Sequence, residues 1–228
     1  MREPDVQLRY DPIIRFLKTH RIEGNILEIG GGVAGIAQFL DTPVTGCDPY
    51  FLSKKGKRAD WQGRKPLPNI VPIGGTATNI PFPDNAFPFV VSSDMLEHLP
   101  KPLRQKAIRE MLRVSSRYVV FGFPCGSVAA RAERLLFCLG KTLLGKEHRW
   151  LKEHLQHGLP TEQEVTKFLN GLVFQSKGNT NVGSWALVTI ASAIARPLGW
   201  LFYPLALLQF PPYYRNLVII DKRSPHAD

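Results

Sequence analysis

Short apolar runs alternate with segments of helical periodicity through the first half of the chain. The runs end at glycine, proline or a polar residue, as buried strands of a parallel sheet do. We predict strands at 25–29, 44–47, 70–73, 87–93 and 118–123. Because segments with helical spacing separate them and the connections are short, the pattern predicts an α/β protein with a doubly wound parallel sheet.

Capping residues and prolines mark the expected helix starts. Asp11 and Pro12 form a start signal for a helix that runs to His20. Thr161 and Glu164 form a capping box that opens a helix through residue 169. Further helices are predicted at 33–40, 103–114 and 129–144, and a sixth and a seventh strand at 172–176 and 217–220.

The segment 182–210 is apolar apart from Arg196, and Pro197 and Pro204 interrupt it. Both of its ends return to strands of one sheet, and each half is too short to span a bilayer core of about 30 Å. We therefore predict a helical hairpin within an insertion at 182–214. Three roles remain open for it: membrane or lipid contact, a pocket lid or ordinary core, and a dimer contact.

The formal net charge of +10 over 228 residues suits an anionic membrane surface, an acidic substrate or nucleic acid. Much of the excess lies in one stretch that contains Lys54, Lys55, Lys57, Arg58, Arg64 and Lys65. Nucleic acid is disfavoured, because no aromatic residues interleave with the basic ones as in nucleic-acid-binding modules. A solvated loop explains the stretch as well as a binding role does.

The cysteines and the N-terminus point to a reducing compartment. Cys47, Cys125 and Cys138 are odd in number and lack CxxC spacing, which disfavours both a disulfide framework and a zinc site. The first residues contain no apolar segment of a secretory signal. We expect a single cytoplasmic domain over residues 1–228, with contact to a membrane surface as an option.

A glycine-rich turn follows the first predicted strand. Residues 30–35 satisfy G-x-G-x-x-G between a strand and a helix, where the backbone must turn tightly and let a ligand approach. Asp48 ends the next strand, and its carboxylate can accept hydrogen bonds from both hydroxyls of a ribose. These features fit a dinucleotide as well as an adenosyl sulfonium. Glu28 distinguishes the two ligands, because its carboxylate would repel the pyrophosphate of a dinucleotide and attract a cationic ligand. The same carboxylate can anchor the loop or the ammonium group of a ligand.

The segments LEIGGG (27–32), IPFPDNAF (80–87) and DMLEHLP (94–100), together with Asp48, resemble the successive motifs of small class I methyltransferases. The resemblance covers roughly residues 25–125. It implies a Rossmann-like seven-stranded sheet, with helical insertions after strand 5 and between strands 6 and 7, and S-adenosylmethionine as the cofactor. It also implies that the insertion at 126–160 caps the substrate side.

The resemblance assigns the parts of the cofactor to residues of this chain. Glu28 and the glycines would contact its amino acid end, Asp48 its ribose, and Pro49 and Tyr50 its adenine. Thr76 and Ala77 would line the adenine pocket, and Ser93 and Asp94 would close the floor near the sulfonium. The predicted cofactor-binding set is Glu28, Gly30, Gly31, Gly32, Asp48, Pro49, Tyr50, Thr76, Ala77, Ser93 and Asp94.

The chain departs from the family pattern at two positions. Thr76 stands where the family often has an aspartate that accepts from the adenine amino group, and a threonine oxygen accepts more weakly. Pro88 stands where an aspartate often follows the phenylalanine. Both departures affect the expected affinity for the cofactor more than its identity.

Methyl transfer from a sulfonium mainly requires alignment and exclusion of water, and a base where the acceptor loses a proton. Histidine is the natural base near neutral pH, and His98 and His154 are the catalytic candidates. The alternative interpretation of His98, a helix-start residue that packs against the cofactor loop, is slightly favoured over catalysis. Asp94, Glu97 and His98 also resemble a spacing that some methyltransferases use to hold a divalent metal. The same residues are common without a metal, and we predict none.

The acceptor, a small molecule or a lipid, is not specified by the sequence, nor is the oligomeric state. Two rival functions remain. One is a SAM-binding scaffold without activity, because no residue marks an essential base. The other is an NAD-dependent oxidoreductase that uses the same glycine turn.

Overall fold

Seven strands form one sheet in the order β3-β2-β1-β4-β5-β7-β6 in the computed structural model, which describes residues 3–22, 24–52, 63–145 and 147–223. Strands β1 to β5 are parallel, whereas β7 is antiparallel to both of its neighbours. The strands are β1 (Ile26–Ile29), β2 (Val44–Asp48), β3 (Ile70–Gly74), β4 (Phe87–Ser93), β5 (Ser115–Pro124), β6 (Phe174–Asn181) and β7 (Tyr213–Asp221). The seven-stranded sheet is confirmed, and its parallel part ends at β5.

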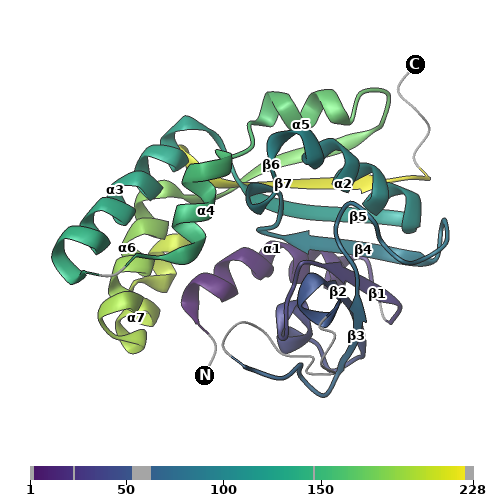
Figure 1. Cartoon of the computed structure of the whole chain (residues 1–228), viewed down its shortest axis with the longest axis horizontal. Helices are drawn as coiled ribbons and strands as arrows, with labels where there is room; N and C mark the ends of the chain where they lie inside the picture. The colour runs from purple at the N-terminus through teal and green to yellow at the C-terminus, as the bar shows by residue number, and fades with distance from the viewer. Residues whose placement is uncertain (1–2, 23, 53–62, 146, 224–228) are drawn as a thin grey trace.

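Helices cover both faces of the sheet and extend beyond one end of it (Figure 1). The α-helices are α1 (Pro4–Thr19), α2 (Lys101–Val114), α3 (Gly126–Leu144), α4 (Arg149–His157), α5 (Glu162–Phe168), α6 (Val182–Ile194) and α7 (Arg196–Ala206). Short 3₁₀ helices lie at η1 (Gly35–Phe39), η2 (Pro49–Leu52) and η3 (Leu96–His98).

Two apolar cores, one on each face, hold the helices to the sheet. Successive side chains of a strand point to opposite faces, so Val90 of β4 enters one core and Phe89 and Val91 enter the other. The first core also contains Ile108 and other apolar residues of α2 and α5. The second contains Ile13 and the apolar face of α1. Burial on both faces explains why the parallel strands read as continuous apolar runs.

The first helix begins earlier than the sequence signal predicted. It starts at Pro4, which occupies the first turn, and Pro12 lies inside it. Proline in a helix interior removes one backbone donor. The buried stripe that includes Leu8, Ile13 and Leu17 nevertheless continues across this position, so packing on the sheet outweighs the lost hydrogen bond.

The helix predicted at 33–40 is also wrong, because only the short 3₁₀ helix η1 forms there. Side chains from outside satisfy its ends. The Ile36 N–H donates to the Glu28 carboxylate, and the Asn69 amide donates to the carbonyl oxygens of Ala37 and Leu40. With these groups already paired, a further helical turn would gain little.

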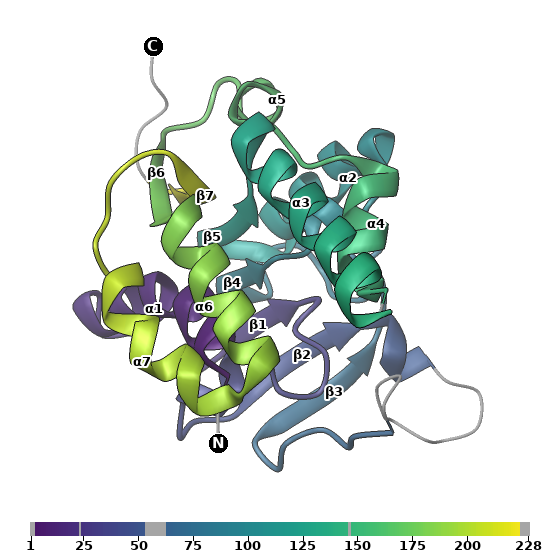
Figure 2. The same cartoon turned by 90° about the vertical axis from the view of Figure 1, so that its left-hand side faces the viewer.

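The capped helix and the hairpin were predicted correctly. Thr161 caps α5 by accepting from the Glu164 N–H. The hairpin consists of α6 and α7, which are separated by extended backbone at Ala195 and pack against each other and against α1 (Figure 2). Over the described residues, no helix is long and apolar enough to cross a membrane.

Candidate functional site

The glycine turn is shaped by the side chain beneath it. Gly30 and Gly32 adopt φ values of +77° and +60°, which favour glycine. A Cβ at Gly31 or Gly35 would lie 2.3 Å or 1.8 Å from atoms of Glu28, so these two glycines leave room for that carboxylate. A Cβ at Gly32 would meet no atom within 4 Å. Gly32 is therefore the part of the turn whose backbone a ligand can approach.

Glu28 anchors this turn from below. Its Oε1 accepts from the Tyr10 hydroxyl at 2.7 Å, and its Oε2 accepts from the Ile36 N–H at 2.8 Å. Burial raises the pKa of Glu28 to about 7, although both hydrogen bonds oppose the rise. Of the two roles expected for Glu28, the structure forms the contact with the loop.

Asp48 lies beside the turn, at the end of the neighbouring strand. The Gly32 N–H donates to its Oδ2 at 3.0 Å and the Tyr50 N–H to its Oδ1 at 2.9 Å. Burial raises its pKa, while these two hydrogen bonds lower it. A carboxylate has about four lone pairs, so Asp48 keeps capacity for the two hydroxyls of a ribose. Pro49 and Tyr50 follow directly in η2.

The remaining predicted cofactor residues lie at the ends of β3 and β4. Thr76 pairs with Asn79 across a tight turn after β3, and Ala77 is buried in the core beside Met95. Ser93 ends β4 and is buried, and no described residue is a hydrogen-bond partner for its hydroxyl. The predicted cofactor residues therefore gather at the carboxyl edge of the parallel strands, where ligands bind in such sheets.

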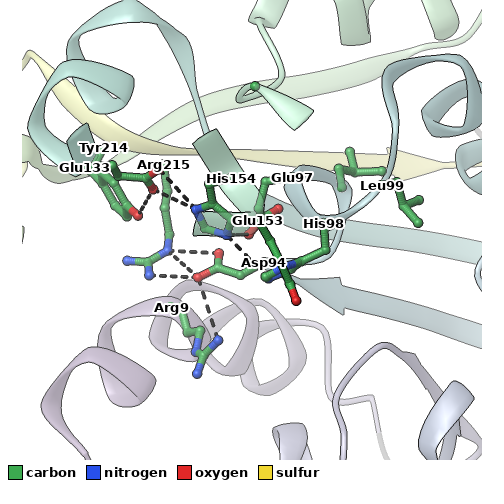
Figure 3. A network of polar contacts seen from close by, with 12 residues as sticks. Arg9, Asp94, Glu97, His98, Leu99, Glu133, Glu153, His154, Tyr214 and Arg215 are labelled. Atoms are coloured by element: carbon green, nitrogen blue, oxygen red, sulfur yellow. Dashed lines mark hydrogen bonds and ion pairs between the residues drawn. The ribbon is translucent and has the colours of Figure 1, made fainter. Parts of the chain in front are cut away.

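Asp94 is bound by two arginines that sequence reasoning did not identify (Figure 3). Arg215 of β7 donates to it from Nε at 3.0 Å and from Nη2 at 2.8 Å, and Arg9 of α1 lies at 3.8 Å. Burial acts to raise the pKa of Asp94, but Arg215 and Arg9 outweigh it and the pKa lies below its usual range. No motif marks Arg215, which reaches Asp94 because β7 pairs with β5.

His98 and His154, the two predicted catalytic residues, meet although they are 56 positions apart. Their Nε2 atoms are 3.4 Å apart. Glu153 binds His98 Nδ1 at 2.9 Å, and Glu133 binds His154 Nδ1 at 3.0 Å. Burial and the neighbouring His154 lower the pKa of His98. Figure 3 shows the two rings, with Glu97 beside them.

Glu97 is the third member of this histidine cluster, which we define as Glu97, His98 and His154. Its Oε1 lies 3.9 Å from His154 Nε2, and one ligand atom from each residue lies within 4.8 Å of the others. Burial and the charge of Asp94 raise the pKa of Glu97 well above its usual value. Asp94, which the predicted metal spacing included, is turned to the arginines instead and is not part of the cluster.

A small cleft lies between Tyr50, which follows Asp48 in the chain, and His98 of the histidine cluster. It has a volume of about 160 Å³ and is lined by Tyr50, His98, Arg149, Trp150 and Glu153. Sites for whole cofactors measure roughly 300 Å³ or more, so this cleft suits only the reacting end of a ligand. Another hollow, of about 170 Å³ near Tyr118 and Asp221, contains none of the predicted site residues.

The residues present fit S-adenosylmethionine. Gly32 offers an open backbone surface, and Asp48 offers an acceptor at the end of β2. Tyr50 lies next in the chain and lines the cleft. The basic residues predicted at 54, 55, 57 and 58 fall outside the described part of the chain.

Comparison with known proteins agrees with this geometry. Residues 27–118 match the family model described as a methyltransferase domain. No curated protein matches the sequence.

Solved structures share the fold at low sequence identity. Magnesium protoporphyrin IX methyltransferase from Synechocystis, with bound S-adenosylhomocysteine, is 13% identical over 95% of this chain and 83% of that chain, with a TM-score of 0.54. The YcgJ protein of Bacillus subtilis is 16% identical over 95% and 100%, with a TM-score of 0.55. Phosphoethanolamine N-methyltransferase 2 from Haemonchus contortus is 14% identical over 93% and 53%, with a TM-score of 0.56.

These likenesses establish the fold, and the range of the family match includes the glycine turn and the segments 80–87 and 94–100. The family match over residues 27–118 and the shared fold together support a class I S-adenosylmethionine-dependent methyltransferase.

Proposed function

We propose that this protein transfers the methyl group of S-adenosylmethionine to an apolar, lipid-like acceptor that it takes from a membrane surface. The observation that supports the acceptor class is the exposed apolar surface of α6 and α7. These helices lie toward the same side of the molecule as α3 and α4, which follow the carboxyl end of β5 (Figures 1 and 2).

The chemistry requires little of the protein beyond placement. The methyl group of the sulfonium is already activated, so alignment with the acceptor and exclusion of water supply most of the acceleration. The cleft beside Tyr50 and His98 joins the expected cofactor position to the histidine cluster. An acceptor bound there would have its reacting atom beside imidazole nitrogens, which suits an acceptor that must lose a proton.

Both helices of the hairpin expose aliphatic side chains at helical spacing. On α6 the spacing is i, i+3 and i+7, and on α7 it is i, i+3 and i+7 as well. The residues are Leu187, Ile190 and Ile194 on α6 and Leu198, Leu201 and Leu205 on α7. Leu207, Leu208 and Phe210 continue the surface after α7. An isolated exposed leucine needs no explanation, but exposed aliphatic residues repeated at this spacing on two packed helices favour an interaction site.

Basic side chains accompany this surface. Helix α3 packs against α6 and exposes Arg131 and Arg134. Leu135 and Leu139, also on α3, are exposed as well. Exposed leucines beside arginines favour the interface of an anionic bilayer, into which the helices would dip without crossing.

Vesicle flotation tests the membrane part of the proposal. We expect the protein to float with vesicles of phosphatidylcholine and phosphatidylglycerol. The double variant Leu201→Glu/Leu205→Glu should lower the bound fraction more than 10-fold, because each leucine contributes about 1.5 kcal/mol or more when it leaves water. Leu201 is 68% exposed, so the substitutions leave the core intact.

A matched control is Leu103→Glu on α2. Leu103 is 41% exposed but lies outside the hairpin, so this variant should float like the wild type. Equal flotation of the wild type and the double variant would contradict membrane contact through α7.

Activity assays test the transferase part and its rivals. S-adenosylhomocysteine should raise the melting temperature and NAD should not. S-adenosylhomocysteine should accumulate from S-adenosylmethionine when a total lipid extract is the acceptor source, and less so with a water-soluble extract. Cofactor binding without turnover in either extract would favour the scaffold role.

A further inference from the structure

The two histidines of the cluster face each other in an arrangement that requires a positive charge. Each ring presents Nδ1 to a carboxylate, Glu153 for His98 and Glu133 for His154. A carboxylate accepts hydrogen bonds, so in the neutral rings Nδ1 carries the hydrogen and Nε2 carries a lone pair. The two Nε2 atoms are 3.4 Å apart. Two lone pairs this close repel unless a cation or a proton lies between them.

Glu97 adds a buried carboxyl group to the same point. Its side chain is 0% exposed, and neither carboxylate oxygen accepts a hydrogen bond from another residue in the described part of the chain. Burying a carboxylate without a partner is costly, so such groups pair with a cation or coordinate a metal. Arg215 is close enough to lower the pKa of Glu97, but it forms no hydrogen bond with that carboxyl group, because its Nε and Nη2 donate to Asp94 and Asp5.

We infer that Glu97, His98 and His154 bind a divalent transition-metal ion, and that Zn²⁺ fits the ligand set best. Bonds of about 2.0 Å in a tetrahedral site place ligand atoms about 3.3 Å apart. The two Nε2 atoms already have this spacing, and the Oε1 of Glu97, 3.9 Å from His154 Nε2, needs only a small shift. Imidazole ligands select against Mg²⁺ and Ca²⁺, which prefer oxygen.

The surroundings are those of a metal site. Glu133 and Glu153 orient the two imidazoles in the way that outer carboxylates orient metal-bound histidines. The Tyr214 hydroxyl in turn donates to Glu133 at 2.6 Å, which fixes that carboxylate. Two histidines and one glutamate leave a fourth position of a tetrahedral ion open.

The open position gives the ion a role, and this role rests on the proposed function. His98 lines the cleft with Tyr50, so an ion at the cluster would lie at the wall of the acceptor cleft. An oxygen atom of the acceptor could fill the open position and be held in line with the methyl group. The two histidines would then act on the acceptor through the ion rather than take its proton themselves.

Direct metal binding tests the inference without any activity measurement. The full-length protein is dialysed against a chelator and titrated with Zn²⁺ by calorimetry, and with Co²⁺ by visible absorption. We expect one equivalent to bind, with a tetrahedral Co²⁺ spectrum. Glu97→Gln and His154→Gln should each weaken binding at least about 100-fold, and Glu133→Gln about 10- to 100-fold.

His157→Gln is the control, because His157 lies on the same helix outside the cluster and should not affect binding. Far-UV circular dichroism establishes that each variant is folded. The inference fails if the wild type binds no Zn²⁺, or if Glu97→Gln and His154→Gln bind it as tightly as His157→Gln does. The lone pairs would then be separated by a shared proton.

Binding of S-adenosylhomocysteine to the same metal-free samples separates this inference from the proposed function. Retained S-adenosylhomocysteine binding with no Zn²⁺ binding would overturn the metal site alone. Loss of both would also count against the methyltransferase assignment of the cleft.

Discussion

Glu28 and Glu97 are both buried carboxylates near the site, but they differ in the hydrogen bonds that they accept. Glu28 is 2% exposed and accepts hydrogen bonds from a tyrosine hydroxyl and a backbone N–H. Glu97 is 0% exposed and accepts none from another described residue. Burial raises the pKa of both groups. The comparison separates a carboxylate that holds the fold together from one whose partner has to come from outside the chain.

The difference lies in what surrounds each group rather than in burial itself. Glu28 faces donors from α1 and η1, and so the glycine turn is fixed before any ligand binds. Glu97 lies beside the imidazoles of His98 and His154, and no other described residue donates a hydrogen bond to its carboxyl group. A buried carboxyl group without hydrogen-bond partners is an unfavourable arrangement that calls for an explanation such as a missing ligand or ion.

The largest expected effect is on the free energy of unfolding when each carboxylate is removed in turn. Glu28→Ala leaves two buried donors without acceptors and should lower the free energy of unfolding by about 3–5 kcal/mol. Glu97→Ala removes a group that stabilises nothing in the metal-free protein, and we expect a change within about 1 kcal/mol. Urea denaturation in the presence of a chelator measures both. Equal losses of unfolding free energy in the two variants would show that Glu97 stabilises the metal-free fold as much as Glu28 does.

The pH dependence of stability should show the raised pKa of Glu28 directly. Because Glu28 has a pKa of about 7 in the folded chain and an ordinary value of 4.5, it binds its proton more tightly in the folded state. Its contribution to stability is present in full below pH 4.5 and is lost as the pH rises to about 7. Glu28→Gln removes this dependence.

The difference in unfolding free energy between the wild type and Glu28→Gln should change by about 3 kcal/mol across this window. Denaturation curves at intervals from about pH 4 to about pH 8 measure it. Parallel profiles of the two proteins would show that Glu28 ionises normally.

A smaller effect is expected at the second carboxylate of the cofactor edge. Asp48→Asn should weaken S-adenosylhomocysteine binding about 10- to 100-fold, because hydrogen bonds to a charged group contribute about 1.5–3 kcal/mol. Calorimetry measures the affinity, and the exposed Asp41→Asn is the control. Unchanged affinity in Asp48→Asn would place the ribose elsewhere.

The smallest change concerns the partner of Glu28. Tyr10→Phe removes the donor to Oε1 and should cost about 1–2 kcal/mol of stability. It should also move the pH window of Glu28 upward, because this hydrogen bond lowers the pKa of the carboxylate. A pH window that moves downward would show that the Tyr10 hydrogen bond does not lower the pKa of Glu28.

The errors of the sequence predictions have physical causes. Strand β6 was predicted at 172–176 but spans Phe174–Asn181, because its first half is an exposed edge and shows little apolar pattern. The helix at 33–40 became a short 3₁₀ helix because Asn69, distant in the sequence, satisfied its last carbonyl groups.

Residues far apart in the sequence account for the parts of the site that were missed. Arg215 binds Asp94 across 121 positions, and Glu133 binds His154 across 21. Neither belongs to a motif. Their side chains meet because β7 lies beside β5 and α3 packs against α4.

Local sequence patterns were enough to predict the parallel strands, the glycine turn and the position of Asp48 at the end of β2. These features depend on local periodicity and on backbone conformations that only glycine adopts readily. A short stretch of neighbouring residues specifies both. The tertiary structure was needed to show that Tyr10 and the Ile36 N–H donate to Glu28 and that two arginines bind Asp94. It was also needed to show that Glu97, His98 and His154 form one cluster. Such pairings depend on the order of strands and the packing of helices, which bring side chains together regardless of their spacing in the chain.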